Sequence, residues 1–172
     1  MKKLIAITDK DIMGVEKLSS AKPRIAVGVV LFDEDNHIAL SYIANWDEYL
    51  LPGGGVDDGE DFLTAAKREM WEETGCKCEI IGEIGITYEN RGVEDFVQEK
   101  SFYIAKVVGE KGELHLEDYE IASGTTVKWY TMAEAVQILL KQNCEGKYGL
   151  KFCKRRDVAV LSEVMALQFD RA

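Results

Sequence analysis

The feature that most constrains this chain is residues 51–76, where a proline and three glycines run directly into a strongly acidic segment, LPGGGVDDGEDFLTAAKREMWEETGC. Pro52 and Gly53–Gly55 interrupt regular structure, because proline lacks a backbone donor and glycine loses much entropy on ordering. From Asp61 the residues favour a helix, which we expect to end at Gly75. The sequence therefore predicts a strand end, a loop and a helix in immediate succession.

Three glutamates and an arginine share one side of this predicted helix. At about 100° per residue, Glu72, Glu69 and Glu73 lie about 40°, 100° and 140° around the axis from Arg68. Like charges at such spacings destabilise an isolated helix by about 0.2–0.5 kcal/mol per pair, and a hard divalent cation reverses the effect. The pattern indicates a metal site, with a solvated helix face as the alternative.

An apolar strip beside the acidic arc favours the metal site over a solvated face. Leu63, Ala66 and Met70 fall between about 160° and 220° on the same helix. Such a strip packs against a sheet or another helix. We therefore expect the acidic arc to lie at the rim of a packed cleft.

The rest of the chain mixes strand-like and helix-like segments. Apolar, β-branched runs between turn residues predict strands, and helical spacing of apolar residues predicts helices. The expected strands are 24–32, 37–43, a short one before Pro52, 76–89, 95–108 and 125–130, and the expected helices are 61–74, 132–142 and 150–168. Residues 1–20 are expected to form an edge strand or an arm. The mixture predicts an α/β (α+β) fold in one domain, residues 1–172.

The charge balance limits the partners that we expect. A net charge of -10 argues against general nucleic-acid or anionic-membrane binding, because those surfaces attract positive charge. A phosphate substrate would then need a metal or a local cation. The opening MKKLIAITDK has an apolar run too short for a signal peptide or a membrane span, which favours a cytoplasmic protein.

The cysteines indicate structural rather than redox or metal chemistry. The four cysteines include no C-x-x-C pair, and the two histidines supply few zinc ligands. We expect reduced thiols, with a redox pair of Cys76 and Cys78 as the alternative.

The glycine loop and the acidic helix together resemble the Nudix box. The residues that stand at its spacings are Gly54, Glu60, Arg68, Glu69, Met70, Glu72, Glu73, Gly75 and Cys76. The flanking segments IAVGVVLF, LPGG and VKWYTMAEA are also similar to this family. The resemblance implies an α/β/α sandwich with a mixed β-sheet. It further implies hydrolysis of a diphosphate linkage in a nucleoside diphosphate derivative.

The resemblance also implies a metal centre. Glu69, Glu72 and Glu73, with the backbone carbonyl of Gly53, are expected to hold Mg²⁺ or Mn²⁺. Such ions prefer oxygen ligands and lower the pKa of a bound water, which would attack phosphorus. Arg68 is expected to pair with Glu72 one turn along the helix and hold it in position.

The sequence leaves more than one candidate for the general base that takes the proton from this water. Glu69 is the leading candidate by resemblance. A glutamate of a later loop often serves as base or extra ligand in this family, which suggests Glu120 or, alternatively, Glu117. A solvated surface glutamate is the competing interpretation of Glu120.

The sequence gives fewer signals for the identity of the substrate than for the metal centre. The MutT-like group, which hydrolyses nucleoside triphosphates, is most similar in size and in the strand IAVGVV, but Ser41 and Tyr42 stand where that group tends to carry arginines. We expect a small nucleotide-type substrate, no nucleic-acid or membrane partner and, from the family alone, a homodimer. A non-catalytic nucleotide-sensing domain is the alternative, although such domains usually lose box glutamates. Isopentenyl diphosphate isomerase shares the fold but needs more histidines.

Two further groups of residues have competing interpretations. Trp46, Tyr49 and Phe62 could stack on a base, but core packing is the favoured interpretation. The basic segment KFCKRRD, residues 151–157, could hold a polyanion. We expect it instead to be the solvated first turn of the last helix.

Overall fold

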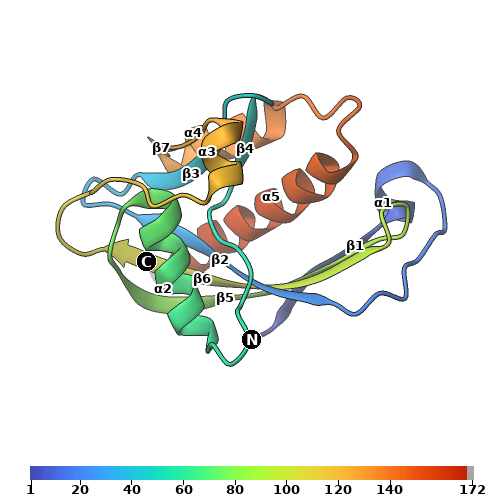
Figure 1. The fold of residues 1–172 in the computed structure, drawn as a ribbon, viewed down its shortest axis with the longest axis horizontal. Helices are drawn as coiled ribbons and strands as arrows, with labels where there is room; N and C mark the ends of the chain where they lie inside the picture. The colour runs from blue at the N-terminus through green and yellow to red at the C-terminus, as the bar shows by residue number, and fades with distance from the viewer. Residues whose placement is uncertain (170–172) are drawn as a thin grey trace.

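The computed structural model describes residues 1–169, whose seven strands form one mixed sheet (Figure 1). The strands are β1 (Lys3–Thr8), β2 (Arg24–Phe32), β3 (Ile38–Ile43), β4 (Glu48–Leu50), β5 (Cys78–Arg91), β6 (Phe96–Val107) and β7 (Thr125–Tyr130). They lie in the order β1-β5-β6-β2-β3-β4, and β7 also pairs with β3. β1 is parallel to β5 and β2 to β6, while the other pairs are antiparallel.

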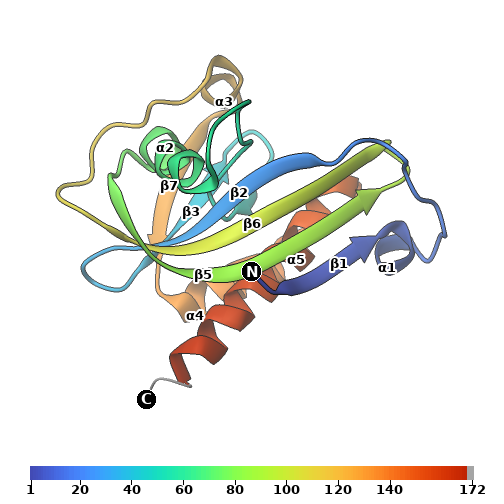
Figure 2. The ribbon, with the colours of Figure 1, turned by 90° about the horizontal axis from the view of Figure 1, so that it is seen from below.

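Helices cover both faces of the sheet. Figure 2 shows α2 (Phe62–Thr74) above the sheet, and α4 (Met132–Lys141) and α5 (Tyr148–Phe169) below it. The alternation of side chains along β2 explains these two layers, because Val27 and Val29 pack with α2 whereas Val30 and Phe32 pack with α4 and α5. The expected α/β/α sandwich with a mixed β-sheet is confirmed.

Local signals set the bounds of the helix that carries the acidic arc. The side chain of Asp61 caps its start by accepting hydrogen bonds from the N–H groups of Leu63 and Thr64, both at 3.0 Å. Gly75 ends the helix with a φ of 68°. The expected helix 61–74 therefore differs from α2 only by its cap, and strands 24–32 and 125–130 coincide with β2 and β7.

The structure differs from the sequence-based expectations in several places. Of the two alternatives for residues 1–20, the edge strand is confirmed by β1, but the short helices α1 (Asp9–Met13) and α3 (Asp118–Ser123) were not predicted. Leu63 is 47% exposed, so its place in the apolar strip was wrong, and Ala65 is buried in its stead. Among the described residues, no helix has the length and hydropathy needed to cross a membrane.

Candidate active site

The glycine loop runs along the side of β2 that faces away from β6, where β3 pairs only with the end of the strand. The N–H of Val27 donates to the Gly54 carbonyl at 2.9 Å, and the N–H of Val29 donates to the Pro52 carbonyl at 3.1 Å. Gly53 has a φ of 132°, and a Cβ there would stand 2.3 Å from the Val27 carbonyl oxygen. Because only glycine allows this approach, the loop can lie flat against the sheet and present its backbone to the acidic helix.

Arg68 organises the carboxylates of the site. Its Nη1 donates to Glu69 Oε1 at 2.8 Å and to Glu72 Oε2 at 3.0 Å. Its Nε and Nη2 donate to the two carboxylate oxygens of Glu60 at 3.0 and 2.9 Å, and Nη2 also donates to the Gly55 carbonyl at 2.9 Å. The predicted pair with Glu72 is confirmed, and the further bonds tie the helix to the glycine loop.

Two of the predicted metal ligands lie in contact with the loop. Glu73 Oε2 accepts from the Ser41 hydroxyl at 2.9 Å and from the Gly53 N–H at 3.1 Å. Glu69 is 7% exposed and lies so close to Gly54 that a Cβ there would stand 2.5 Å from Glu69 Oε1. Burial first, and then the charge of Glu73, raise the pKa of Glu69 to about 7. Burial also raises the pKa of Glu73.

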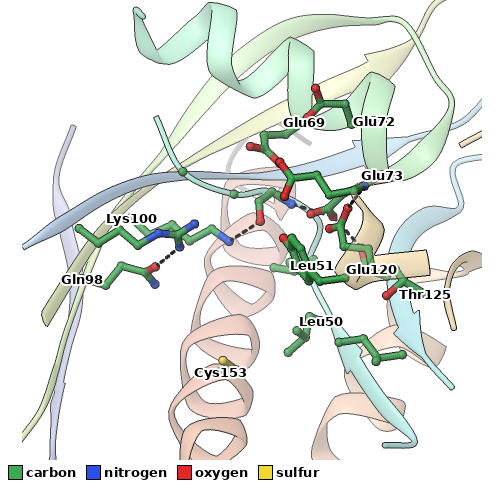
Figure 3. A pocket seen from close by; sticks show the side chains of 18 of the residues that line it. Leu50, Leu51, Glu69, Glu72, Glu73, Gln98, Lys100, Glu120, Thr125 and Cys153 are labelled. Carbon is green, nitrogen blue, oxygen red and sulfur yellow. Dashed lines mark hydrogen bonds between the residues drawn. The ribbon is translucent and has the colours of Figure 1, made fainter. Parts of the chain in front are cut away.

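A buried ammonium lies beside this carboxylate pair. Lys100 projects from β6, is 5% exposed, and donates from Nζ to the Gly53 carbonyl at 3.3 Å (Figure 3). Burial above all, and then the charge of Arg156, lower the pKa of Lys100 to about 8. The two backbone groups of Gly53 are thus bound by opposite charges, its N–H by Glu73 and its carbonyl by Lys100.

These groups border a cleft of about 570 Å³. One part of its lining is acidic and is made by the α2 carboxylates with Glu117 and Glu120, while another part is basic and is made by Arg24, Arg91, Lys100 and Arg156. Arg91 and Arg156 pair with Glu89, whereas Arg24 and Lys100 form no ion pair among the described residues and are the local cations best placed for a phosphate. Sequence reasoning did not identify Arg24 and Lys100, because single basic residues in predicted strands give no recognisable spacing.

The basic segment at the start of α5 is partly buried, so its interpretation as a solvated turn was wrong. Arg156 is 4% exposed and Asp157 fully buried. Arg156 Nη1 donates to Glu89 at 3.0 Å and its Nε to Asp157 at 2.7 Å. The other carboxylate oxygen of Asp157 accepts the N–H of Leu51 at 3.0 Å, which connects α5 to the residue before the glycine loop.

The later glutamates, which are the candidates for a second base or ligand, also belong to the cleft. Glu117 and Glu120 both line the cleft, and Figure 3 shows Glu120 close to Glu73. Glu120 Oε2 accepts the N–H of Glu117 at 2.9 Å as part of the cap of α3. This capping bond holds the Glu120 side chain at the start of the helix.

The aromatic residues divide between the cleft and the core. Trp46 is 55% exposed and lines the cleft, which contradicts core packing for this residue. Tyr49 packs against Tyr42 with ring centroids 4.6 Å apart and against the core. Phe62 is 40% exposed. A base could therefore stack on Trp46.

The cysteines are free thiols, as expected. Cys76 is buried and Cys78 is partly buried. Burial raises the pKa of Cys76 and raises that of Cys78 to about 11. Thiols held protonated in this way are poor nucleophiles, which argues against the redox pair.

The donor set fits a hard divalent cation in its chemistry. Glu69, Glu72, Glu73 and the Gly53 carbonyl all offer oxygen, and a cation would offset the repulsion between Glu69 and Glu73. Within residues 1–169, no three histidine, cysteine or acidic side chains are already arranged around one point to hold a metal ion. Protein groups, Arg68 above all, bind these carboxylates instead, so ion binding requires side chains to turn.

Fold and site together define an enzyme that hydrolyses acid anhydrides. Residues 22–150 match the family model described as NUDIX domain. The chain is 32% identical over 144 residues to the RNA pyrophosphohydrolase of Caulobacter vibrioides, an alignment that covers 72% of this chain and 81% of the relative. It is 30% identical over 108 residues to diphosphoinositol polyphosphate phosphohydrolase 3-beta of Homo sapiens, covering 62% and 61% of the two chains. This protein belongs to the Nudix hydrolase family.

The same fold occurs in solved structures of distant sequence. The Ap4A hydrolase of C. elegans, in a binary complex, superimposes with a TM-score of 0.59 at 18% identity. The alignment covers 86% of this chain and 98% of the other. The Nudix hydrolase of Nitrosomonas europaea gives a TM-score of 0.57 at 19% identity, covering 76% and 88%. These likenesses support the sandwich architecture.

Proposed function

We propose that this protein hydrolyses a diphosphate linkage in a nucleotide-type substrate with the help of Mg²⁺ or Mn²⁺. The observation that carries the proposal is a single cleft with two kinds of lining, the carboxylates of α2 and the cations Arg24 and Lys100. Carboxylates suit a divalent ion, and cations suit the phosphate oxygens of the substrate. Both are needed to bring a diphosphate into a protein of net charge -10.

The ion would be held by Glu69, Glu72, Glu73 and the backbone carbonyl of Gly53. When bound, the ion would neutralise the phosphate oxygens and lower the pKa of a water molecule that it binds. The role of Arg68 is to hold Glu69 and Glu72 beside each other before the ion binds, because its guanidinium bonds to both. The glycine loop brings backbone rather than side chains to the phosphates, which allows close approach.

Glu69 is our candidate for the general base. Its carboxylate lines the cleft against the glycine loop, and in the ion-free protein burial raises its pKa, which makes it a stronger base than a free glutamate. Glu120, or alternatively Glu117, would serve as a second base or an additional ligand from α3. Their position in the lining of the cleft supports this assignment.

Two substrate classes fit the cleft. A free nucleoside triphosphate would place its phosphates between the two linings and its base near Trp46. The 5′-triphosphate end of an RNA presents the same chemistry, and the name of the Caulobacter vibrioides relative supports it. The high negative charge of this chain favours the small nucleotide, because a longer RNA adds phosphates that need further cations.

A substrate panel tests the proposal. The protein is incubated with Mg²⁺ and nucleoside triphosphates, dinucleoside polyphosphates, nucleotide sugars or a 5′-triphosphorylated oligonucleotide, and released phosphate and pyrophosphate are measured. We expect turnover that Glu73→Gln abolishes and that Arg155→Gln, on the exposed side of α5, preserves. Absence of turnover on every substrate, or full activity of Glu73→Gln, would refute the proposal.

A further inference from the structure

Lys100 occupies a position that is unusual for a lysine. It comes from the middle of β6, and the residue is 5% exposed. Its ammonium donates to the neutral carbonyl of Gly53 rather than to a carboxylate, at 3.3 Å. Burying an ammonium is costly unless nearby groups offset the loss of water, so a lysine at this position needs an explanation beyond packing.

The surrounding residues leave room for this one side chain. At Gly28 of β2, a Cβ would stand 2.8 Å from Lys100 Cε and 2.3 Å from Phe102 Cε1. The Lys100 Nζ also lies 5.4 Å from the centre of the Phe102 ring, on its face. Because Gly28 has no side chain, Lys100 and the Phe102 ring both have room beside β2, and Lys100 reaches the glycine loop.

The Lys100 ammonium takes the place of a metal ion in two respects. It binds the Gly53 carbonyl, the only backbone oxygen that we assign to the metal centre. It also supplies positive charge near Glu73, whose carboxylate binds the N–H of the same glycine at 3.1 Å. One buried cation therefore binds the Gly53 carbonyl and favours the charged form of the nearby Glu73 in the absence of an ion.

We infer that the Lys100 ammonium and the divalent cation compete for the Gly53 carbonyl, because two cations at one oxygen repel each other, so that Lys100 withdraws from this oxygen when the ion binds. The inference rests on the proposed function, because it takes Gly53 to be a metal ligand. Lys100 lines the cleft, and the released ammonium therefore has space on the side where the phosphates are expected. Lys100 keeps the loop and Glu73 in place before the ion arrives, and it weakens ion binding as a consequence.

Metal binding without substrate tests the competition. Free Mn²⁺ is measured by electron paramagnetic resonance during titration of the wild type, Lys100→Met and Arg24→Met. Arg24 is the matched control, because it lines the same cleft but its Nη1 bonds Gln98 at 2.9 Å rather than the loop carbonyl. We expect Lys100→Met to bind Mn²⁺ about tenfold more tightly, a coupling of ordinary size between linked sites, and Arg24→Met to change affinity much less.

The outcomes separate this inference from the proposed function. Unchanged or weaker binding by Lys100→Met, or an equal gain in Arg24→Met, overturns the competition. Absence of binding by the wild type, or equal binding by Glu73→Gln, overturns the metal site itself.

A second measurement uses the unsubstituted protein, in case Lys100→Met does not fold. NMR follows the ε-methylene signals of the lysine side chains while Mg²⁺ is added. The signal of Lys100 is shifted from the others because its side chain lies over the Phe102 ring. We expect the Lys100 signal to move with the same midpoint as Mg²⁺ binding and the signals of surface lysines to stay. A Lys100 signal that stays fixed through saturation refutes the release.

Discussion

Asp157→Asn is predicted to lower both stability and activity, because Asp157 connects α5 to the glycine loop. Its two carboxylate oxygens accept hydrogen bonds from the Leu51 N–H at 3.0 Å and from Arg156 Nε at 2.7 Å, and the residue is fully buried. Asparagine keeps the shape but removes the charge and places a donor where one acceptor stood. Arg156 keeps Glu89 as a counter-ion at 3.0 Å, so the pairing is only partly lost.

The size of the effect follows from this geometry. Removing one partner of a buried ion pair costs about 3–5 kcal/mol, and the remaining carboxylate favours the lower end, about 3 kcal/mol. In a chain of this length each kcal/mol lowers the melting temperature by about 2–4 °C. We therefore expect the melting temperature of Asp157→Asn to fall by about 6–12 °C. The turnover number should fall as well, because the loop loses one of its supports.

Thermal unfolding followed by circular dichroism, and steady-state kinetics on the best substrate of the panel, measure the two effects. Arg155→Gln is the control, because this neighbour has a half-exposed side chain 3.8 Å from Asp11, and such a pair contributes less than about 1 kcal/mol. A melting temperature for Asp157→Asn equal to that of Arg155→Gln would refute the buried-pair argument. A less stable variant with full turnover at low temperature would refute the connection to the loop.

Three other substitutions test separate parts of the structure. Burial raises the pKa of Glu89, but two neighbouring guanidinium groups more than offset this and hold the pKa below its ordinary value. The stability that it contributes is present above the unfolded pKa of about 4.3 and is lost as the pH falls through the folded pKa. Glu89→Gln should therefore flatten the fall in the free energy of urea unfolding below about pH 4.5, and an unchanged slope contradicts this. Gly54→Ala should weaken Mn²⁺ binding, because its Cβ would stand 2.5 Å from Glu69 Oε1 and force that carboxylate to move, whereas Gly82→Ala, whose nearest neighbour would be 4.0 Å away, should bind normally. Trp46→Ala should raise KM about tenfold with little change in kcat if the exposed indole stacks on a base, and an unchanged KM excludes that contact.

The elements that could be predicted from the sequence are those with local signals. β2 and β7 have the expected bounds because runs rich in β-branched and aromatic residues lie between turn residues. The helix of the box has a capping aspartate at one end and a glycine at the other, and both act within a few residues. α3 spans only six residues, Asp118–Ser123, which is too short to show a helical period. Its existence could not be inferred from the pattern.

The parts of the site that were not predicted depend on contacts between distant residues. Asp157 binds a backbone group 106 residues earlier, and Arg156 binds a carboxylate 67 residues earlier. Lys100 reaches a carbonyl 47 residues away, through space that a glycine on another strand leaves open. No local spacing encodes such pairs, since they exist only after the sheet and α5 have packed. The buried start of α5 was misjudged for this reason.

The glycine loop is held from three directions by protein groups alone. Backbone bonds attach it to β2, Lys100 binds it from β6, and Asp157 holds the residue before it from α5. The carboxylates of α2, by contrast, are held by Arg68 in pairs that must open before an ion can bind. Preorganised groups contribute most where they need not move during the reaction. The loop backbone is therefore the fixed part of the site and the glutamates are its adjustable part. Substitutions in α5 that remove a support of the loop should therefore lower the turnover number, whereas substitutions at Arg68 should first change the affinity for the ion.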